Sequence, residues 1–210
     1  MSEALVLLLA YLAAAGVLTL TPGVDTAMIL RTTTAHGARS GAAAALGIGL
    51  GCLVWGAAAA FGLTALLTTS TLAIAVLKWA GGAWLVWMGA KLLWKPRRAL
   101  AVEVGLADPP TPWAAFRRGL LTNLLNPKVG VFYMTFLPQF IPAGADVARY
   151  CLMLAAIHVV MGLVWSACLI ALSVRLGAFL RRPAVVTTMD RLTGGVFVGF
   201  GLKLALMEQA

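Results

Sequence analysis

The sequence has few charged residues. Asp, Glu, Lys and Arg together make up 11% of its 210 residues, whereas they make up roughly a quarter of an ordinary soluble domain. Apolar residues amount to 61%, so a soluble globular protein of this composition would lack the polar surface it needs. The same apolar content excludes intrinsic disorder. A chain of this length has room for about six membrane-spanning helices of ~20 residues joined by short loops.

Cysteine and histidine are also scarce, at three and two residues. The cysteines lie inside apolar runs without a CxxC pair, so we expect no metal site and no cofactor. An intramembrane enzyme is a weak alternative: GxSxG and HExxH motifs are missing, and Ser166 and His158 are too far apart on one expected helix to touch. A cation or metal-ion channel is a second alternative. It would need several carboxylates along its path, and only Asp25 is available.

Long apolar segments are plentiful, and they are continuous rather than alternating, which favours helices over a barrel. We therefore expect an all-α membrane protein with six transmembrane helices at about residues 4–30, 41–67, 72–94, 119–141, 150–174 and 184–207. A polar, proline-containing connection separates three helices from three. The expected organisation is a first three-helix repeat at 1–94, a linker at 95–118 and a second three-helix repeat at 119–210.

The basic residues are unevenly distributed over the expected loops. Twelve of the 16 lie on the first, third and fifth connections and their flanks, and three lie on the other side. Cytoplasmic loops collect Lys and Arg, so these three connections, including the 95–118 linker, are expected in the cytoplasm and both termini outside. The net charge of +9 is thus mainly a signal of topology, and we expect no nucleic-acid partner.

The two halves of the chain resemble each other in sequence. Residues 20–24 are LTPGV and residues 125–129 are LNPKV, an offset of 105 positions. Because each half has an odd number of spans, the second must be inverted relative to the first, as in many secondary transporters. Chance similarity between segments rich in leucine and glycine is the alternative.

Two prolines fall inside expected spans, one in each half. Thr21-Pro22 and Asn126-Pro127 each fit an N-cap followed by proline at the first helical position, so a helix is expected to begin in mid-membrane. Such a break exposes backbone N–H groups and the positive end of a helix dipole. Two converging ends would form a site for an anionic group such as a carboxylate. The alternative is two simple kinks stabilised by neighbouring helices.

Two charged residues lie well inside the spans, Asp25 and Lys128. Each costs roughly 2.5–3.5 kcal/mol at the centre of a span, so a function is expected: proton coupling for Asp25 and substrate carboxylate binding for Lys128. A structural ion pair between them is the alternative. His158 is a second candidate for proton coupling, unless it is a neutral helix contact. The other candidate substrate-binding residues are Thr21, Pro22, Gly23, Asn123, Asn126, Pro127, Tyr133 and Gln139.

Two GxxxG patterns allow helices to approach closely. They begin at Gly47 and at Gly195, and small residues at this spacing pack helix against helix in membranes. The contacts can form within one chain or between two copies, so a homodimer is one expected partner state.

Four short motifs, at 21–23, 77–81, 123–128 and 137–140, read TPG, LKWAG, NLLNPK and LPQF. In this order and spacing they resemble the LysE/RhtB family of bacterial amino-acid exporters, nearest to its threonine and homoserine exporters. The resemblance implies a multi-pass protein of the bacterial inner membrane, with periplasmic termini, that exports small amino acids or their derivatives by proton antiport. Two departures occur: Val24 replaces a second proline of the family motif, and Trp55 stands near a position where some members have histidine.

Overall fold

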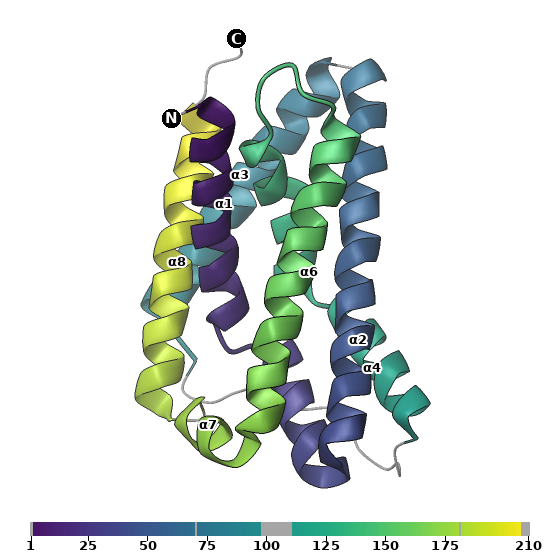
Figure 1. Cartoon of the computed structure of the whole chain (residues 1–210). Helices are drawn as coiled ribbons and strands as arrows, with labels where there is room; N and C mark the ends of the chain where they lie inside the picture. Colours follow the sequence, from purple (N-terminus) through teal and green to yellow (C-terminus); the bar gives the residue numbers. More distant parts are fainter. Residues whose placement is uncertain (1, 70, 98–110, 181, 207–210) are drawn as a thin grey trace.

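The computed structural model is a bundle of helices and describes residues 2–69, 71–97, 111–180 and 182–206 (Figure 1). These residues form helices and turns with no strand among them, which confirms the all-α fold class. The elements are α1 (Glu3–Leu20), α2 (Val24–Thr69), α3 (Thr71–Trp94), α4 (Pro112–Leu124), α5 (Pro127–Val131), the π-helix η1 (Phe132–Phe136), the 3-10 helix η2 (Leu137–Phe140), α6 (Val147–Ala171), α7 (Ser173–Leu180) and α8 (Pro183–Leu206).

Within the described ranges, three helices are both long and apolar enough to cross a membrane. They are Glu3–Leu20, Val24–Gly62 and Val147–Ala171. The apolar segments expected at 72–94 and 184–207 coincide closely with α3 and α8. The chain therefore has the helices of a membrane protein, whereas six spans in an inverted repeat remain a prediction.

The long helix α2 consists of two helices joined at Gly37, whose φ of 82° and ψ of 170° are not helical. Glycine adopts a positive φ without the steric cost that a side chain imposes. Thr33 and Gly41 would lie ~12 Å apart in a continuous helix, yet a Cβ added at Gly41 would lie 2.1 Å from Thr33 Oγ1. The first expected loop is therefore a tight reversal of direction within α2, seen at the lower end of the bundle (Figure 1).

Glycines bring two pairs of helices into backbone contact. On α2, a Cβ added at Gly47 would lie 2.0 Å from the Phe116 carbonyl oxygen of α4. Between α3 and α8, a Cβ at Gly89 would lie 2.6 Å from the carbonyl oxygen of Gly194. The first GxxxG pattern thus packs helices within one chain. At Gly195 and Gly199 an added Cβ meets nothing within 4 Å.

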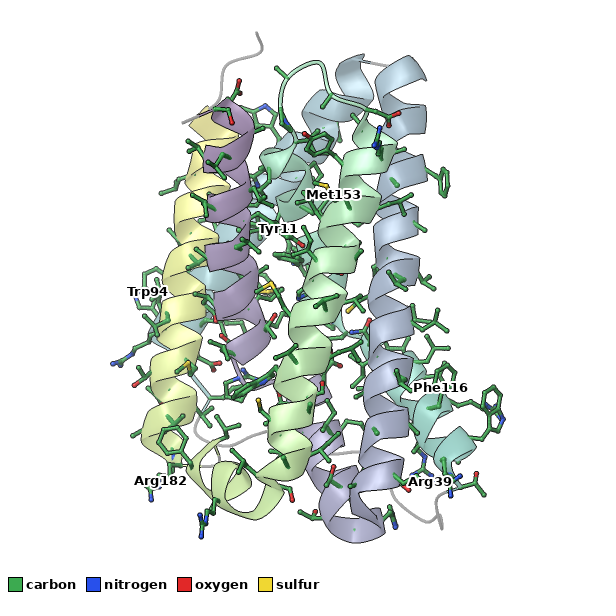
Figure 2. The ribbon with its side chains drawn as sticks, viewed as in Figure 1. Tyr11, Arg39, Trp94, Phe116, Met153 and Arg182 are labelled. Carbon is green, nitrogen blue, oxygen red and sulfur yellow. The ribbon has the colours of Figure 1, made fainter. Side chains whose placement is uncertain are left out.

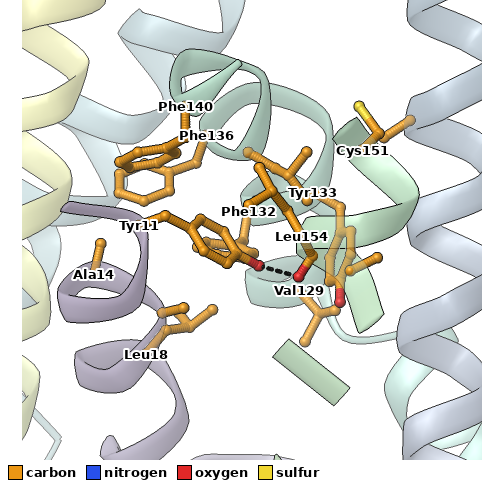
Figure 3. Close-up of a cluster of buried hydrophobic side chains, with 14 of the residues drawn as sticks. Tyr11, Ala14, Leu18, Val129, Phe132, Tyr133, Phe136, Phe140, Cys151 and Leu154 are labelled. Atoms are coloured by element: carbon orange, nitrogen blue, oxygen red, sulfur yellow. Dashed lines mark hydrogen bonds between the residues drawn. The ribbon is translucent and has the colours of Figure 1, made fainter. Parts of the chain in front are cut away.

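An aromatic cluster fills the space between α1, η1, η2 and α6 (Figure 3). Tyr11, Phe132, Phe136 and Phe140 are buried there, and the Tyr11 hydroxyl donates a hydrogen bond of 2.7 Å to the Leu154 carbonyl of α6. Between membrane-spanning helices such a cluster stabilises the fold by close packing and by this hydrogen bond, because lipid is as apolar as the rings themselves. The cluster fixes α1 against α6 on one side of the site described below.

Two of the basic connections, the first and the fifth, lie at one end of the bundle. The Gly37 reversal and α7 lie at the end opposite the start of α1 and the end of α8 (Figure 1). Arg39 and Arg182 project at this same end (Figure 2). The described start and end of the chain therefore share one side, as the loop charges predict.

Candidate functional site

Two helix breaks lie where the prolines predict them, at residues 21–23 between α1 and α2 and at 125–126 between α4 and α5. At the second break, the Asn126 side chain accepts a hydrogen bond of 3.1 Å from the backbone N–H of Lys128. Asn126 is thus the N-cap of α5, and Pro127 follows it at the first helical position. The capping prediction is confirmed here.

The first break differs from its prediction in detail. Thr21 is the C-cap of α1, with φ −68° and ψ 115°, and α2 begins only at Val24. The N-cap assigned to Thr21 is therefore wrong, as is the first helical position assigned to Pro22. Proline disfavours helical geometry in the residue before it, so Pro22 makes Thr21 extended and ends α1. The Thr21 hydroxyl contacts Thr193 of α8 at 2.5 Å.

Two cations bind backbone carbonyls at the end of α1 and in the break that follows it. The Lys128 amino group donates to the carbonyls of Leu18 and Thr21 at 3.2 and 3.3 Å. The Arg97 guanidinium donates to the carbonyl of Pro22 at 2.9 Å. The C-terminal end of a helix attracts positive charge through its dipole. Lys128 therefore links the two breaks, because it belongs to α5 and binds the end of α1.

Asp25, in the first turn of α2, faces the second break. Its Oδ2 accepts hydrogen bonds from the side-chain amides of Asn123 and Asn126, at 3.0 and 3.3 Å. Its Oδ1 is buried and has no hydrogen-bond partner among the described residues. Lys128 thus donates to carbonyls and Asp25 accepts from amides, and no salt bridge joins these two described residues. The alternative of an ion pair between Asp25 and Lys128 does not describe this structure.

A cavity lies between the first break, α2, the start of α5 and one face of α6. It contains ≈ 680 Å³ of empty space, counting the part that is open to the outside. The predicted site residues that line it are Thr21, Gly23, Asp25, Asn126, Lys128 and His158. The structure thus brings together both charged residues, both breaks and a residue of α6.

Five predicted site residues do not line this cavity. Asn123 lies behind it and holds Asp25, while Pro22 and Pro127 belong to the breaks themselves. Tyr133 is buried and hydrogen-bonds to His158. Gln139 lies in η2, where its side-chain amide donates to the Thr135 carbonyl at 3.1 Å, and the structure brings it into no contact with the cluster around Asp25.

His158 is held by a partner on the broken fourth segment. Its Nδ1 lies 2.9 Å from the Tyr133 hydroxyl, and its ring lies 5.1 Å from that of Phe132, centroid to centroid. The histidine is buried and lines the cavity. A neutral imidazole can donate at one nitrogen and accept at the other, so this pair can pass a proton along its hydrogen bond.

One pair of charges was missed by sequence reasoning. Asp190 of α8 is fully buried, and its carboxylate accepts hydrogen bonds from the backbone N–H and the Nε of Arg97, both at 2.9 Å. Arg97 also binds Pro22, so the pair ties the first break to α8. Asp190 lies inside the expected 184–207 segment, yet only Asp25 and Lys128 are expected from the sequence to lie well inside the spans. An acidic residue inside the expected 184–207 segment was the signal that could have revealed it.

Comparison with known proteins gives consistent results. A family model described as LysE type translocator matches residues 16–208. A homoserine/homoserine lactone efflux protein of Salmonella typhi is 31% identical over 96% of this chain and 97% of its own. A leucine efflux protein of Enterobacter sp. (strain 638) is 30% identical, covering 94% of each chain. An uncharacterized membrane protein of Vibrio cholerae is 33% identical over 94% of this chain and 95% of its own. No solved structure matches.

The family match covers nearly all of the chain, including both helix breaks and the cavity. Its description as a translocator agrees with the apolar helices, three of which are able to cross a membrane in the described part of the chain. The chain therefore belongs to the LysE type translocator family and is a multi-pass membrane transporter rather than an enzyme.

Proposed function

We propose that this protein exports small amino acids or their derivatives across the bacterial inner membrane in exchange for protons. The observation that carries the proposal is the cavity at the two helix breaks, which Asp25 and Lys128 both line. Two relatives are named for the efflux of homoserine or homoserine lactone and of leucine. All three compounds carry an amino group next to a carboxyl or ester group, which suits a site with one acidic and one basic side chain.

Lys128 is the proposed site for the substrate carboxylate. A lysine ammonium has three donors, and two of them are directed at the carbonyls of Leu18 and Thr21. The third can bind an anionic group in the cavity. The start of α5 adds little, because the N–H groups of Lys128, Val129 and Gly130 are already bonded to Asn126. The start of α2, at Gly23 and Val24, is the remaining positive helix end.

Asp25 is the proposed proton-coupling group. Its Oδ1 has no partner and belongs to a residue that lines the cavity, so a proton can bind there without breaking the bonds from Asn123 and Asn126. His158 lines the same cavity as Asp25 and is hydrogen-bonded to Tyr133, and this pair is a candidate relay. The carboxylate would bind a proton when the site faces one side and release it on the other.

Alternating access through an inverted repeat is supported by the way the helices pair. α2 packs on α6 and α3 packs on α8, so the second and third expected spans of each half pair with their counterparts. The contacts at Gly89 and Gly194 are nearly reciprocal: an added Cβ at either would lie 2.6–2.7 Å from the other's carbonyl oxygen. In this arrangement the basic end is cytoplasmic and both termini are periplasmic.

A homodimer remains part of the proposal. Gly195 and Gly199 form the second GxxxG pattern, are exposed and contact no side chain or backbone at the position of an added Cβ. This face of α8 is available for a second copy. The mass of the detergent-solubilised protein, measured by light scattering, distinguishes a dimer from a monomer.

The proposal is tested with purified protein in liposomes that carry an imposed pH gradient. Radiolabelled small amino acids should move against their own gradient only when the pH gradient is present. Lys128→Ala should weaken substrate binding about tenfold to a hundredfold, since it removes a charge-assisted hydrogen bond. Lys95→Ala is the matched control, because Lys95 is exposed and lies outside the cavity. Equal affinities for the two variants would contradict the role of Lys128.

A further inference from the structure

We infer that the substrate is an α-amino acid with a branched aliphatic side chain: its ammonium group binds Asp25, and its side chain packs against an apolar wall kept open by Gly49 and Gly162. This inference rests on the proposed function and adds the class of substrate and the residues that limit its size. Three observations carry it, one at each part of the cavity.

The first observation is the unsatisfied oxygen of Asp25. Both amide donors, from Asn123 and Asn126, bind Oδ2, while Oδ1 is buried without a partner. Leaving a buried acceptor unpaired is costly, so a ligand with an N–H donor at this point gains a hydrogen bond that the protein does not supply. A primary ammonium group donates a hydrogen bond to this oxygen and also balances the negative charge of the Asp25 carboxylate. A proton on the same oxygen would exclude the ammonium, which couples the two fluxes by competition.

The second observation is the apolar wall, formed by α2 and α6. The wall residues are Ile29, Ala45, Ile48, Leu163, Trp165 and Leu169, which line the cavity and pack in one hydrophobic cluster. Among the described lining residues, Asp25 and Lys128 are the acidic and basic ones. Both are engaged by the ammonium and carboxylate of an amino acid. A charged side chain would therefore find no acidic or basic partner left among these residues, and the apolar wall would not compensate for its desolvation.

The third observation is the space at two glycines. Gly162 lies between His158 and Ser166 on α6, one helical turn from each, and all three line the cavity. A Cβ added at Gly162 would meet no heavy atom within 4 Å, and one at Gly49 would make ordinary contacts of 3.4 Å with Val159. Larger side chains at these positions would occupy cavity space without displacing the backbone. The two glycines therefore set how large a substrate side chain can be.

The test compares leucine, alanine and lysine transport by Gly162→Val in liposomes. Leucine transport should fall about tenfold or more relative to alanine transport, the usual scale for steric discrimination in an apolar pocket. Gly62→Val is the matched control, because an added Cβ at Gly62 also meets nothing within 4 Å and Gly62 does not line the cavity. A ratio of leucine to alanine transport that is the same in Gly162→Val and in the wild type would overturn the inference. Lysine transport by the wild type equal to its leucine transport would also overturn it.

The ammonium contact is tested in the wild-type protein with N-acetyl-leucine. This compound keeps the carboxylate and the side chain but has no positive charge, so it should not compete with leucine at tenfold excess. Competition equal to that of unlabelled leucine would overturn the role of Asp25 in binding the ammonium.

A substitution at Trp165 tests whether the substrate side chain is aliphatic or carries a hydroxyl group. Its Nε1 is buried and without a partner among the described residues, so it could serve a hydroxyl on the substrate. Trp165→Phe removes that donor and keeps the aromatic surface, and leucine transport should be preserved. Preference for homoserine over leucine in the wild type, lost in Trp165→Phe, would overturn the aliphatic class. If no amino acid is transported at all, the proposed function fails first, and the two failures are distinguishable.

Discussion

Removing the guanidinium of Arg97 is expected to leave the buried carboxylate of Asp190 without its ion-pair partner. The Asp190 side chain is 0% exposed and that of Arg97 is 33% exposed, so Asp190 would lose its ion-pair partner and two side-chain hydrogen bonds in Arg97→Ala. The carbonyl of Pro22 would lose its partner as well. The substitution therefore weakens both α8 and the first helix break.

The magnitude follows from the burial of the two partners. Truncating one member of a buried ion pair costs about 3–5 kcal/mol. Because a third of the Arg97 side chain is exposed, water can reach part of the space it leaves. We expect a loss near 3 kcal/mol, a change of about a hundredfold in the unfolding equilibrium. Asp190→Asn keeps an acceptor for Arg97 and should cost about half as much.

The assay is denaturant unfolding in detergent micelles, followed by circular dichroism. Arg39→Ala is the matched control, since Arg39 is exposed at the Gly37 reversal, and its loss should stay within about 0.5 kcal/mol. The double variant Arg97→Ala/Asp190→Ala should recover part of the loss, because no unpaired charge remains. Equal stability of Arg97→Ala and Arg39→Ala would refute the structural role of the pair.

Three further predictions concern the fold. Gly47→Ala should lower the melting temperature, because its Cβ would lie 2.0 Å from a carbonyl of α4, whereas Gly62→Ala should raise it through better helix propensity. Equal melting temperatures would contradict the close contact. Gly37→Ala should cost about 1–3 kcal/mol in denaturant unfolding, because φ 82° with ψ 170° is a region that is essentially restricted to glycine. Tyr11→Phe should cost about 1 kcal/mol in the same assay, since the Leu154 carbonyl loses its donor; no loss would mean that the bond contributes nothing.

The helix breaks could be predicted from the sequence because proline acts on its nearest neighbours. It lacks an N–H group and restricts the residue before it, so Pro22 and Pro127 each indicate a helix boundary, with a simple kink as the alternative. Asn126 could be assigned as an N-cap on the same local grounds. The sequence predicts only a loop around Gly37. A glycine by itself does not indicate whether the backbone adopts a positive φ at that position.

The partners of the charged residues could not be predicted, because they depend on how distant helices pack. Lys128 binds carbonyls 107 and 110 positions away, and no local pattern distinguishes this from a pair with Asp25. Arg97 and Asp190 are 93 positions apart. Arg97 follows the end of one apolar segment and Asp190 lies within another, and only the packing of α3 on α8 brings them together.

The central claim is that protons drive amino-acid export through a site built around Asp25. The most direct measurement is the flux of radiolabelled leucine in liposomes with and without a pH gradient, for the wild type, Asp25→Asn and the exposed control Asp146→Asn. We predict that the gradient accelerates flux in the wild type and the control, and has no effect on Asp25→Asn. A gradient response in Asp25→Asn equal to that of the wild type would contradict the claim.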